Sequence, residues 1–216
     1  GLVAVVTCIG RSLISWRSEG PVSSRSLRAV VFAGGASRRM GTDKALITTA
    51  DGSTWLERQV RLLRSLGLEV CVMSAHANHR RCLSGWLGVT VHAEPWSPAG
   101  PLRALSCLLN ADETQALLTS PVDMPALQIE ALQALLDAWR RNESRALVAD
   151  DGQRLQPLLG IYPCSAINRA ALDAELCDGQ ARWLGWLQRI DYDSLQLPAQ
   201  QLSNVNDPTD LAALVG

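Results

Sequence analysis

The string FAGGASRRMGTDK places a pair of glycines ahead of two arginines and a lysine. Gly34 and Gly35 allow the backbone to turn tightly and approach a ligand closely, and consecutive N–H groups in such a turn form an anion-binding concavity. Arg38, Arg39 and Lys44 add forked and mobile donors that suit phosphate oxygens. The glycine pair alone would fit a solvated surface loop, and neither GxxxxGK[ST] nor GxGxxG is present. The whole string predicts a site for the phosphates of a nucleoside triphosphate.

A carboxylate that could work with this loop stands in the stretch SPVDMP. Asp123 directly follows an expected buried strand, which would place it at the edge of the sheet where ligands bind. A carboxylate opposite a phosphate-binding loop is explained by a shared Mg²⁺, a cation that prefers oxygen ligands. Pro125 fixes the turn, and the alternative is that Asp123 is only a turn or helix-cap residue. Asp43 is expected to be an internal partner within its own loop.

Strand and helix patterns alternate at short spacing, which predicts an α/β fold with a mostly parallel sheet and helices on both faces. In such sheets ligands bind beyond the carboxyl ends of the strands, so the loops at 34–44, 94–101 and 120–125 should share one edge. Ser53 or Thr54 is expected to cap the first helix. Strands are expected at 28–33, 68–75, 89–94, 114–121, 144–150 and 155–163, and helices at 53–67, 80–88, 100–111, 126–142, 164–176, 181–190 and 207–216.

The length and composition of the chain limit the number of domains and the classes of protein it can belong to. The chain has 216 residues, 47% of them apolar, and a formal net charge of −1. This suits one α/β domain at 28–216, and residues 1–27 are expected to be an appended or poorly ordered leader. Near-neutral charge argues against a nucleic-acid binder, and no apolar run approaches the length of a membrane-spanning helix. Six cysteines without CxxC spacing fit a reduced, cytoplasmic protein.

Other candidate residues indicate structure rather than chemistry. His76 and His79 stand at HxxH spacing, but no third metal ligand is evident, and both are expected to be surface loop residues. Trp183 and Trp186 are expected to pack in the core. The sequence offers no Ser-His-Asp set with a recognisable nucleophile elbow.

The opening string resembles the LAGGxSxRMGxDK signature of nucleotidyltransferases that activate the molybdenum cofactor, and it is most similar to the molybdenum cofactor guanylyltransferase (MobA) family. Similar blocks follow in order: GPL at 100–102, VDMP at 122–125, QPLLGIYP at 156–163 and NVNDPTDL at 204–211. The resemblance covers about 28–214. It implies a three-layer α/β/α Rossmann-like nucleotidyltransferase fold with a twisted sheet.

The resemblance also implies substrates and partners. GTP would donate GMP to molybdopterin or the molybdenum cofactor, with Mg²⁺ as the metal. Cofactor-delivery proteins and molybdoenzyme apoproteins are the expected protein partners, and neither nucleic acid nor a membrane is expected. Relatives that transfer CMP carry AAG where this chain has AGG. Because glycine lets a larger purine edge approach the backbone, Gly34 favours guanine.

Site residues follow from the matched motifs. Catalysis is assigned by resemblance to Arg39, Lys44 and Asp123, with Asp123 as the metal ligand. Asn204 and Asn206 are implied to contact the pterin substrate or the metal region, with helix capping as the alternative. Arg182 could meet a substrate phosphate or be an ordinary surface arginine. Nucleotide contacts are implied for Ala33, Gly34, Gly35, Ser37, Arg38, Met40, Gly41, Lys44, Ser74, Glu94, Gly100 and Asp123.

The chain departs from the family pattern at several positions, some of which the resemblance places around the base and ribose of the nucleotide. Ser74 replaces the usual Asn, Glu94 stands where the family has Asp, Arg103 and its neighbour alter GPLAG to GPLRA, Gln156 replaces a His, and Asp207 replaces a Thr. Two alternatives to the transfer of GMP therefore remain open. One is a related transferase that uses CTP or a sugar-phosphate acceptor. The other is a catalytically weak homologue that binds nucleotide or cofactor.

Overall fold

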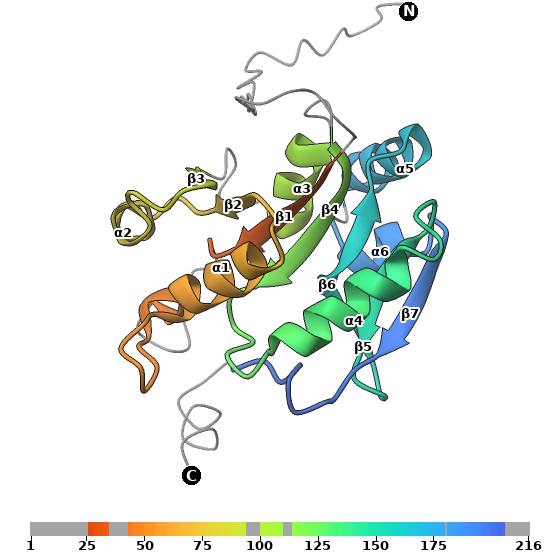
Figure 1. Ribbon diagram of the computed structural model, residues 1–216. Coiled ribbons are helices and arrows are strands. Elements are labelled where there is room, and N and C mark those ends of the chain that lie inside the picture. Colours follow the sequence, from red (N-terminus) through yellow and green to blue (C-terminus); the bar gives the residue numbers. More distant parts are fainter. Residues whose placement is uncertain (1–25, 35–42, 94–99, 110–113, 180, 206–216) are drawn as a thin grey trace, which may run out of the picture.

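The protein forms one sheet of seven strands within the residues that the structure, a computed structural model, describes: 26–34, 43–93, 100–109, 114–179 and 181–205 (Figure 1). Nearly all of the expected leader and the expected helix at 207–216 lie outside these residues. The strands are β1 (Ser26–Phe32), β2 (Val70–Met73), β3 (Val89–His92), β4 (Thr114–Pro121), β5 (Ala146–Asp150), β6 (Leu155–Pro163) and β7 (Tyr192–Gln196).

The sheet is mostly parallel, as expected, with the order β3-β2-β1-β4-β6-β5-β7. β1 pairs in parallel with both β2 and β4, β2 with β3, and β5 with β7. β6 alone among these strands runs antiparallel to its neighbours, β4 and β5. The tight turn between β5 and β6 contains Gly152 at φ 90°, a conformation that favours glycine. A turn this short can join only antiparallel strands.

Helices cover both faces of the sheet (Figure 1). On one face lie α1 (Trp55–Ser65) and α4 (Ile129–Trp139), and on the other lie α3 (Pro101–Leu109), α5 (Ala166–Cys177) and α6 (Trp183–Leu187). β1 is buried on both sides because its residues alternate between two cores. Val31 packs with the α1 and α4 side, whereas Val30 and Phe32 pack with the α3, α5 and α6 side.

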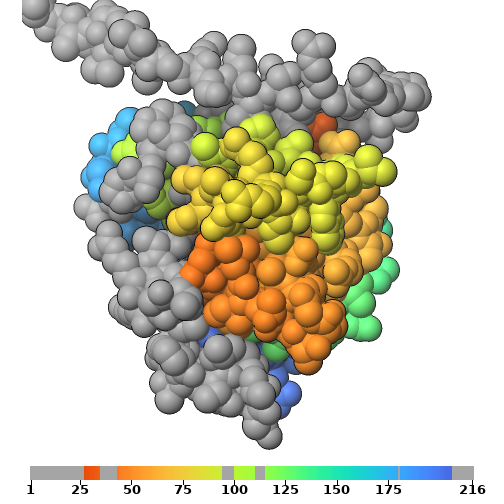
Figure 2. Space-filling model, turned by 90° about the vertical axis from the view of Figure 1, so that its left-hand side faces the viewer, coloured from red at the N-terminus to blue at the C-terminus, as the bar shows by residue number. Residues whose placement is uncertain are grey.

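The segment between β2 and β3 holds a short helix, α2 (Ala77–Cys82). Figure 2 shows α1 in orange against the yellow α2–β3 segment on one face of the molecule. Leu83 belongs to the same apolar cluster as Leu63 of α1, and the guanidinium carbon of Arg61 lies 5.9 Å from the ring centre of Trp86. The α2–β3 segment is therefore fixed to α1 as well as to the sheet.

The structure corrects the expected elements at three places. α2 begins at Ala77 rather than near residue 80, and Gly85 and Gly88, both at positive φ, follow its end. The one-turn 3₁₀ helix η1 (Lys44–Leu46) and the strand β7 were not expected from the sequence. Within the described residues, no helix combines the length and the apolar character needed to cross a membrane.

Candidate active site

Three of the sequence blocks meet at the carboxyl edge of the central strands. Lys44 is the first residue of η1, and Asp123 follows β4. The Nζ atom of Lys44 donates a hydrogen bond to the carbonyl oxygen of Val205 at 2.7 Å and lies 3.8 Å from Oδ2 of Asp123. The backbone N–H of Val205 donates to the carbonyl oxygen of Asp123 at 3.0 Å. Because β1 and β4 are parallel neighbours, with Phe32 opposite Pro121, the segments after them emerge side by side.

Lys44, Asp123 and Val205 form a cluster, and its two charged groups are largely withdrawn from solvent. The side chain of Lys44 is 14% exposed and that of Asp123 is 26% exposed. Burial raises the pKa of the Asp123 carboxyl above its ordinary value, and the nearby Lys44 ammonium opposes that rise. Their separation of 3.8 Å exceeds the 2.7–2.9 Å of a direct charge-assisted hydrogen bond. The two groups therefore form an ion pair that a phosphate or cation could enter.

Helix α1 holds the turn that carries Asp123. The amide nitrogen of Gln59 donates to the carbonyl oxygen of Met124 at 2.7 Å, and Nη2 of Arg58 donates to that of Leu127 at 2.6 Å. Gln59 is buried although it is polar. The sequence analysis did not identify either residue. The sequence could have identified Gln59 as a buried polar residue, because it stands on the apolar face of the helix beside Leu56 and Leu63.

The glycine-rich loop is described only at its two ends. Ala33 is buried, and its N–H donates to the carbonyl oxygen of Met73 at 3.1 Å, so it continues the pairing of β1 with β2. Gly34 follows it and is half-buried.

The other predicted site residues are described only in part. Gly100 lies at φ 78° directly before α3. The predictions for Gly35, Ser37, Arg38, Arg39, Met40, Gly41, Glu94 and Asn206 lie outside the described residues.

A chain of buried hydrogen bonds lies beside the cluster. Oγ of Ser74, at the end of β2, is 2.6 Å from Nδ1 of His79, and Nε2 of His79 is 2.8 Å from Oδ2 of Asp43. Oδ1 of Asp43 accepts from the N–H of Ala45 at 3.1 Å, so Asp43 caps η1. Asp43 serves within its own loop, as expected, but its pairing with His79 of α2 was not expected. The expectation of a surface histidine is wrong for His79, whose side chain is 0% exposed, and holds for His76, which is exposed.

The asparagine block contacts the hairpin of β5 and β6. Nδ2 of Asn204 donates to Oε1 of Gln156 at 3.4 Å, and Nε2 of Gln156 donates to Oδ2 of Asp151 at 2.7 Å. Asn204 lies next to the cluster because it directly precedes Val205, and Gln156 ties its side chain to the hairpin. Arg182 lies elsewhere, at the start of α6, where its N–H is 3.4 Å from a carboxylate oxygen of Glu175 and its side chain is exposed.

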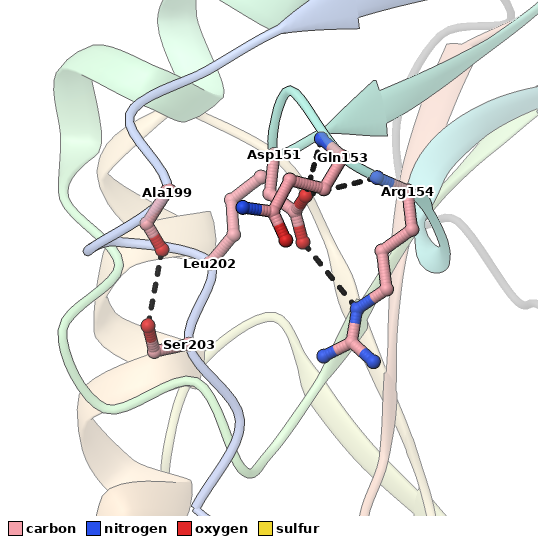
Figure 3. A pocket seen from close by; sticks show the side chains of 6 residues that line it. All are labelled: Asp151, Gln153, Arg154, Ala199, Leu202 and Ser203. Carbon is pink, nitrogen blue, oxygen red and sulfur yellow. Dashed lines mark hydrogen bonds and ion pairs between the residues drawn. The ribbon is translucent and has the colours of Figure 1, made fainter.

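A hollow of about 370 Å³ lies beside Asp151 (Figure 3). The turn after β5 and the segment after β7 line it with Asp151, Gln153, Arg154, Ala199, Leu202 and Ser203. Oδ1 of Asp151 accepts from the N–H groups of Gln153 and Arg154 at 2.9 and 3.0 Å. These bonds, that of Gln153 above all, hold the pKa of the carboxyl below its ordinary value. Asp151 therefore organises the turn that lines the hollow.

Comparisons with known proteins identify the family of this chain. The sequence family described as the MobA-like NTP transferase domain matches residues 29–190 of the chain. A probable molybdenum cofactor guanylyltransferase of Rhodopirellula baltica is 33% identical over 192 residues, which are 86% of this chain and 90% of the relative.

Solved structures share the fold. Molybdopterin-guanine dinucleotide biosynthesis protein A from Archaeoglobus fulgidus superposes with a TM-score of 0.67 at 19% identity, covering 86% of this chain and 95% of the other. The 2-C-methyl-D-erythritol 4-phosphate cytidylyltransferase of Francisella tularensis gives 0.69 at 11% identity, covering 88% and 98%. The Rossmann-like α/β fold expected from the resemblance is confirmed. The chain belongs to the MobA-like NTP transferase family and is a nucleotidyltransferase.

Proposed function

We propose that the protein transfers GMP from GTP to the terminal phosphate of molybdopterin or the molybdenum cofactor, releasing pyrophosphate and forming a molybdopterin guanine dinucleotide. The observation that carries this proposal is the convergence of Lys44, Asp123 and Val205 at the carboxyl edge of the sheet. The relative from Rhodopirellula baltica, named a probable molybdenum cofactor guanylyltransferase, supports the choice of substrates.

The chemistry needs positioning and charge stabilisation rather than a covalent enzyme intermediate. An oxygen of the acceptor phosphate attacks the α-phosphorus of GTP, the bond from that phosphorus to the bridging oxygen of pyrophosphate breaks, and pyrophosphate leaves with the electron pair. The acceptor is already an anion, so no base has to remove a proton from it. Lys44 and Arg39 would stabilise the negative charge that gathers on the phosphate oxygens.

Asp123 is the proposed ligand for Mg²⁺. Its carboxylate is largely buried beside a cation, and burial raises its pKa, so a further positive charge would stabilise its ionised form. The described residues contain no group of three His, Cys, Asp or Glu side chains arranged to hold a metal. Mg²⁺ is commonly held by one or two carboxylates together with substrate phosphates and water. When bound, Mg²⁺ would neutralise phosphate charge.

Gly34 supports guanine over cytosine in this proposal, and the CTP-dependent reaction is the alternative. We further infer that Asn204 helps to bind the acceptor, because it directly precedes Val205 of the cluster and its side chain is held by Gln156. Delivery proteins and molybdoenzyme apoproteins as partners, and a cytoplasmic location, belong to the same proposal.

The test is turnover with purified protein, Mg²⁺ and molybdopterin, supplied in turn with GTP, CTP, ATP and UTP. Pyrophosphate release and the mass of the product are measured. The proposal predicts release that requires molybdopterin and is fastest with GTP, together with a guanine dinucleotide. A cytidine dinucleotide as the main product would move the protein to the alternative reaction. No release with any nucleotide would contradict nucleotidyl transfer.

A further inference from the structure

We propose that His79 is a positioning residue of the nucleotide site, which acts through Asp43 to set the place of Lys44. The inference rests on the proposed function, because it assigns Lys44 to nucleotide binding. His79 stands on α2, outside the motifs that carry the family resemblance.

The hydrogen bonds of His79 define its protonation. Asp43 accepts two bonds, from the N–H of Ala45 and from Nε2 of His79. Oγ of Ser74 accepts from the N–H of His76 at 3.1 Å and lies 2.6 Å from Nδ1 of His79, to which it can donate its own hydrogen. Every donor then meets an acceptor if His79 is neutral and carries its hydrogen on Nε2. Burial also lowers the pKa of His79.

The connection from His79 to Lys44 is short and direct. Asp43 is the N-cap of η1, and Lys44 is the first residue of that helix. A helix of three residues has little stability of its own, so its cap and its tertiary contacts determine where it begins. His79 holds the free oxygen of the capping carboxylate from a helix anchored to β2 and α1. The position of the Lys44 backbone is therefore fixed by the network of Ser74, His79 and Asp43.

The same three residue types form nucleophilic triads in hydrolases, but this network does not suit that role. The residue Ser74 is only 2% exposed, and its hydroxyl is engaged by both His79 and the N–H of His76. A nucleophile must reach a substrate atom, and this hydroxyl is enclosed. The network holds elements together: the end of β2 on one side and the start of η1 on the other.

The sequence provides a direct probe of the proposal, because Lys44 is the only lysine in the chain. Protein grown with lysine labelled with ¹³C at the ε carbon gives a single lysine signal, which reports the surroundings of the Lys44 ammonium without any substrate. The variant His79→Leu removes both imidazole hydrogen bonds at similar volume. His79→Gln keeps an amide that can donate to Asp43, and Ser74→Ala removes only the donor to Nδ1.

His76→Leu is the matched control. It changes the same residue type at the start of the same helix. The ring centre of His76 lies 5.0 Å from that of His79, but its side chain makes no capping hydrogen bond, so this variant controls for the loss of ring packing alone. We expect His79→Leu to shift the Lys44 signal and to weaken binding of GTP with Mg²⁺ roughly tenfold, an effect typical of residues in one hydrogen-bond network. His79→Gln should recover part of both effects, and His76→Leu should show neither.

A double-mutant cycle separates positioning from general damage to the fold. In a Lys44→Ala background, His79→Leu should change GTP affinity by less than about twofold, because the group that it positions is gone. An equal loss in both backgrounds, or a Lys44 signal unmoved in folded His79→Leu protein, would overturn the inference. If His79→Leu does not fold, unchanged signals in folded His79→Gln and Ser74→Ala would overturn it instead.

The failure of the proposed function would look different. A wild-type protein that does not bind GTP, but whose Lys44 signal moves in His79→Leu, would refute guanylyl transfer and support the positioning of Lys44. Binding of GTP together with an unmoved signal would refute the role of His79 and support the proposed function.

Discussion

At the scale of single residues, Lys44 and Asp123 are opposite charges that are largely withdrawn from solvent. Withdrawing either charge from water is costly, and the opposite charge offsets part of that cost. The additional hydrogen bond from Lys44 to Val205 ties the ammonium to the backbone of a third segment. A site of this kind can stabilise the developing charge of a reacting polyphosphate because its groups are already oriented.

Replacing Lys44 by Ala should lower kcat/KM for GTP by about 10²–10³-fold, because a preorganised donor to the phosphates is removed. Steady-state pyrophosphate release measures the effect. The control is Arg140→Ala, which removes an exposed cation paired with Asp137 at 3.6 Å at the end of α4. If Lys44→Ala and Arg140→Ala gave the same activity, the assignment of Lys44 would be wrong.

His79 should make stability depend on pH in a predictable direction. Burial lowers its pKa below the ordinary 6.5, the carboxylate of Asp43 opposes this, and His76, with its ring centre 5.0 Å away, adds to the lowering. The unfolded chain therefore binds more protons than the folded protein below pH 6.5, so the contribution of His79 to stability is lost as the pH falls.

Urea unfolding at pH 7.5, 6.0 and 5.0 measures this effect. The wild type should lose more stability on acidification than His79→Leu, which has no imidazole to titrate. An equal or larger loss in His79→Leu would contradict the assignment of a neutral, buried His79.

At the scale of elements, α1 shows how much a local pattern can predict. Its apolar spacing and a capping residue at 53 or 54 were read from the sequence, and Thr54 and Glu57 form a reciprocal capping box. The short or exposed elements were not predictable in the same way. β7 has the polar sequence YDSLQ and lies at the sheet edge, and η1 has only three residues held by Asp43. Tertiary contacts, rather than local propensity, define both.

Removing the cap of α1 should cost stability. Thr54→Ala deletes the hydroxyl that accepts from the N–H of Glu57 at 3.1 Å, and we expect a loss of about 1 kcal/mol in the free energy of unfolding. Thr54→Ser, which keeps the hydroxyl, is the control and should lose much less. Urea denaturation of the two variants at pH 7 measures both free energies of unfolding. Equal losses in the two variants would show that the cap is not the stabilising feature.

At the scale of the whole molecule, the rule that parallel strands share a carboxyl edge predicted that Lys44 and Asp123 would meet. The order of the strands did not follow from the sequence, since it depends on which buried strands pair over long separations. The hydrogen bond to Val205 and the network through His79 were also missed. A backbone carbonyl carries no residue signal, and a single histidine among polar neighbours resembles a surface residue.

Gly160 of β6 joins the two halves of the sheet, opposite Thr119 of β4 and Val148 of β5. A Cβ atom at this position would lie 2.8 Å from the carbonyl oxygen of Leu147, which belongs to a buried strand and cannot easily move. Gly160→Ala should therefore destabilise the protein by about 1–3 kcal/mol through overpacking. Thermal and urea unfolding measure this, and a variant as stable as the wild type would contradict the close approach of β5 and β6.

Calorimetric titration of the wild-type protein with GTP, CTP, ATP and UTP, each with and without Mg²⁺, tests the central claim most directly. The account predicts that GTP binds most tightly and that Mg²⁺ strengthens its binding. Tighter binding of CTP, or no binding of any nucleotide, would contradict the assignment of the Lys44 and Asp123 site to GTP.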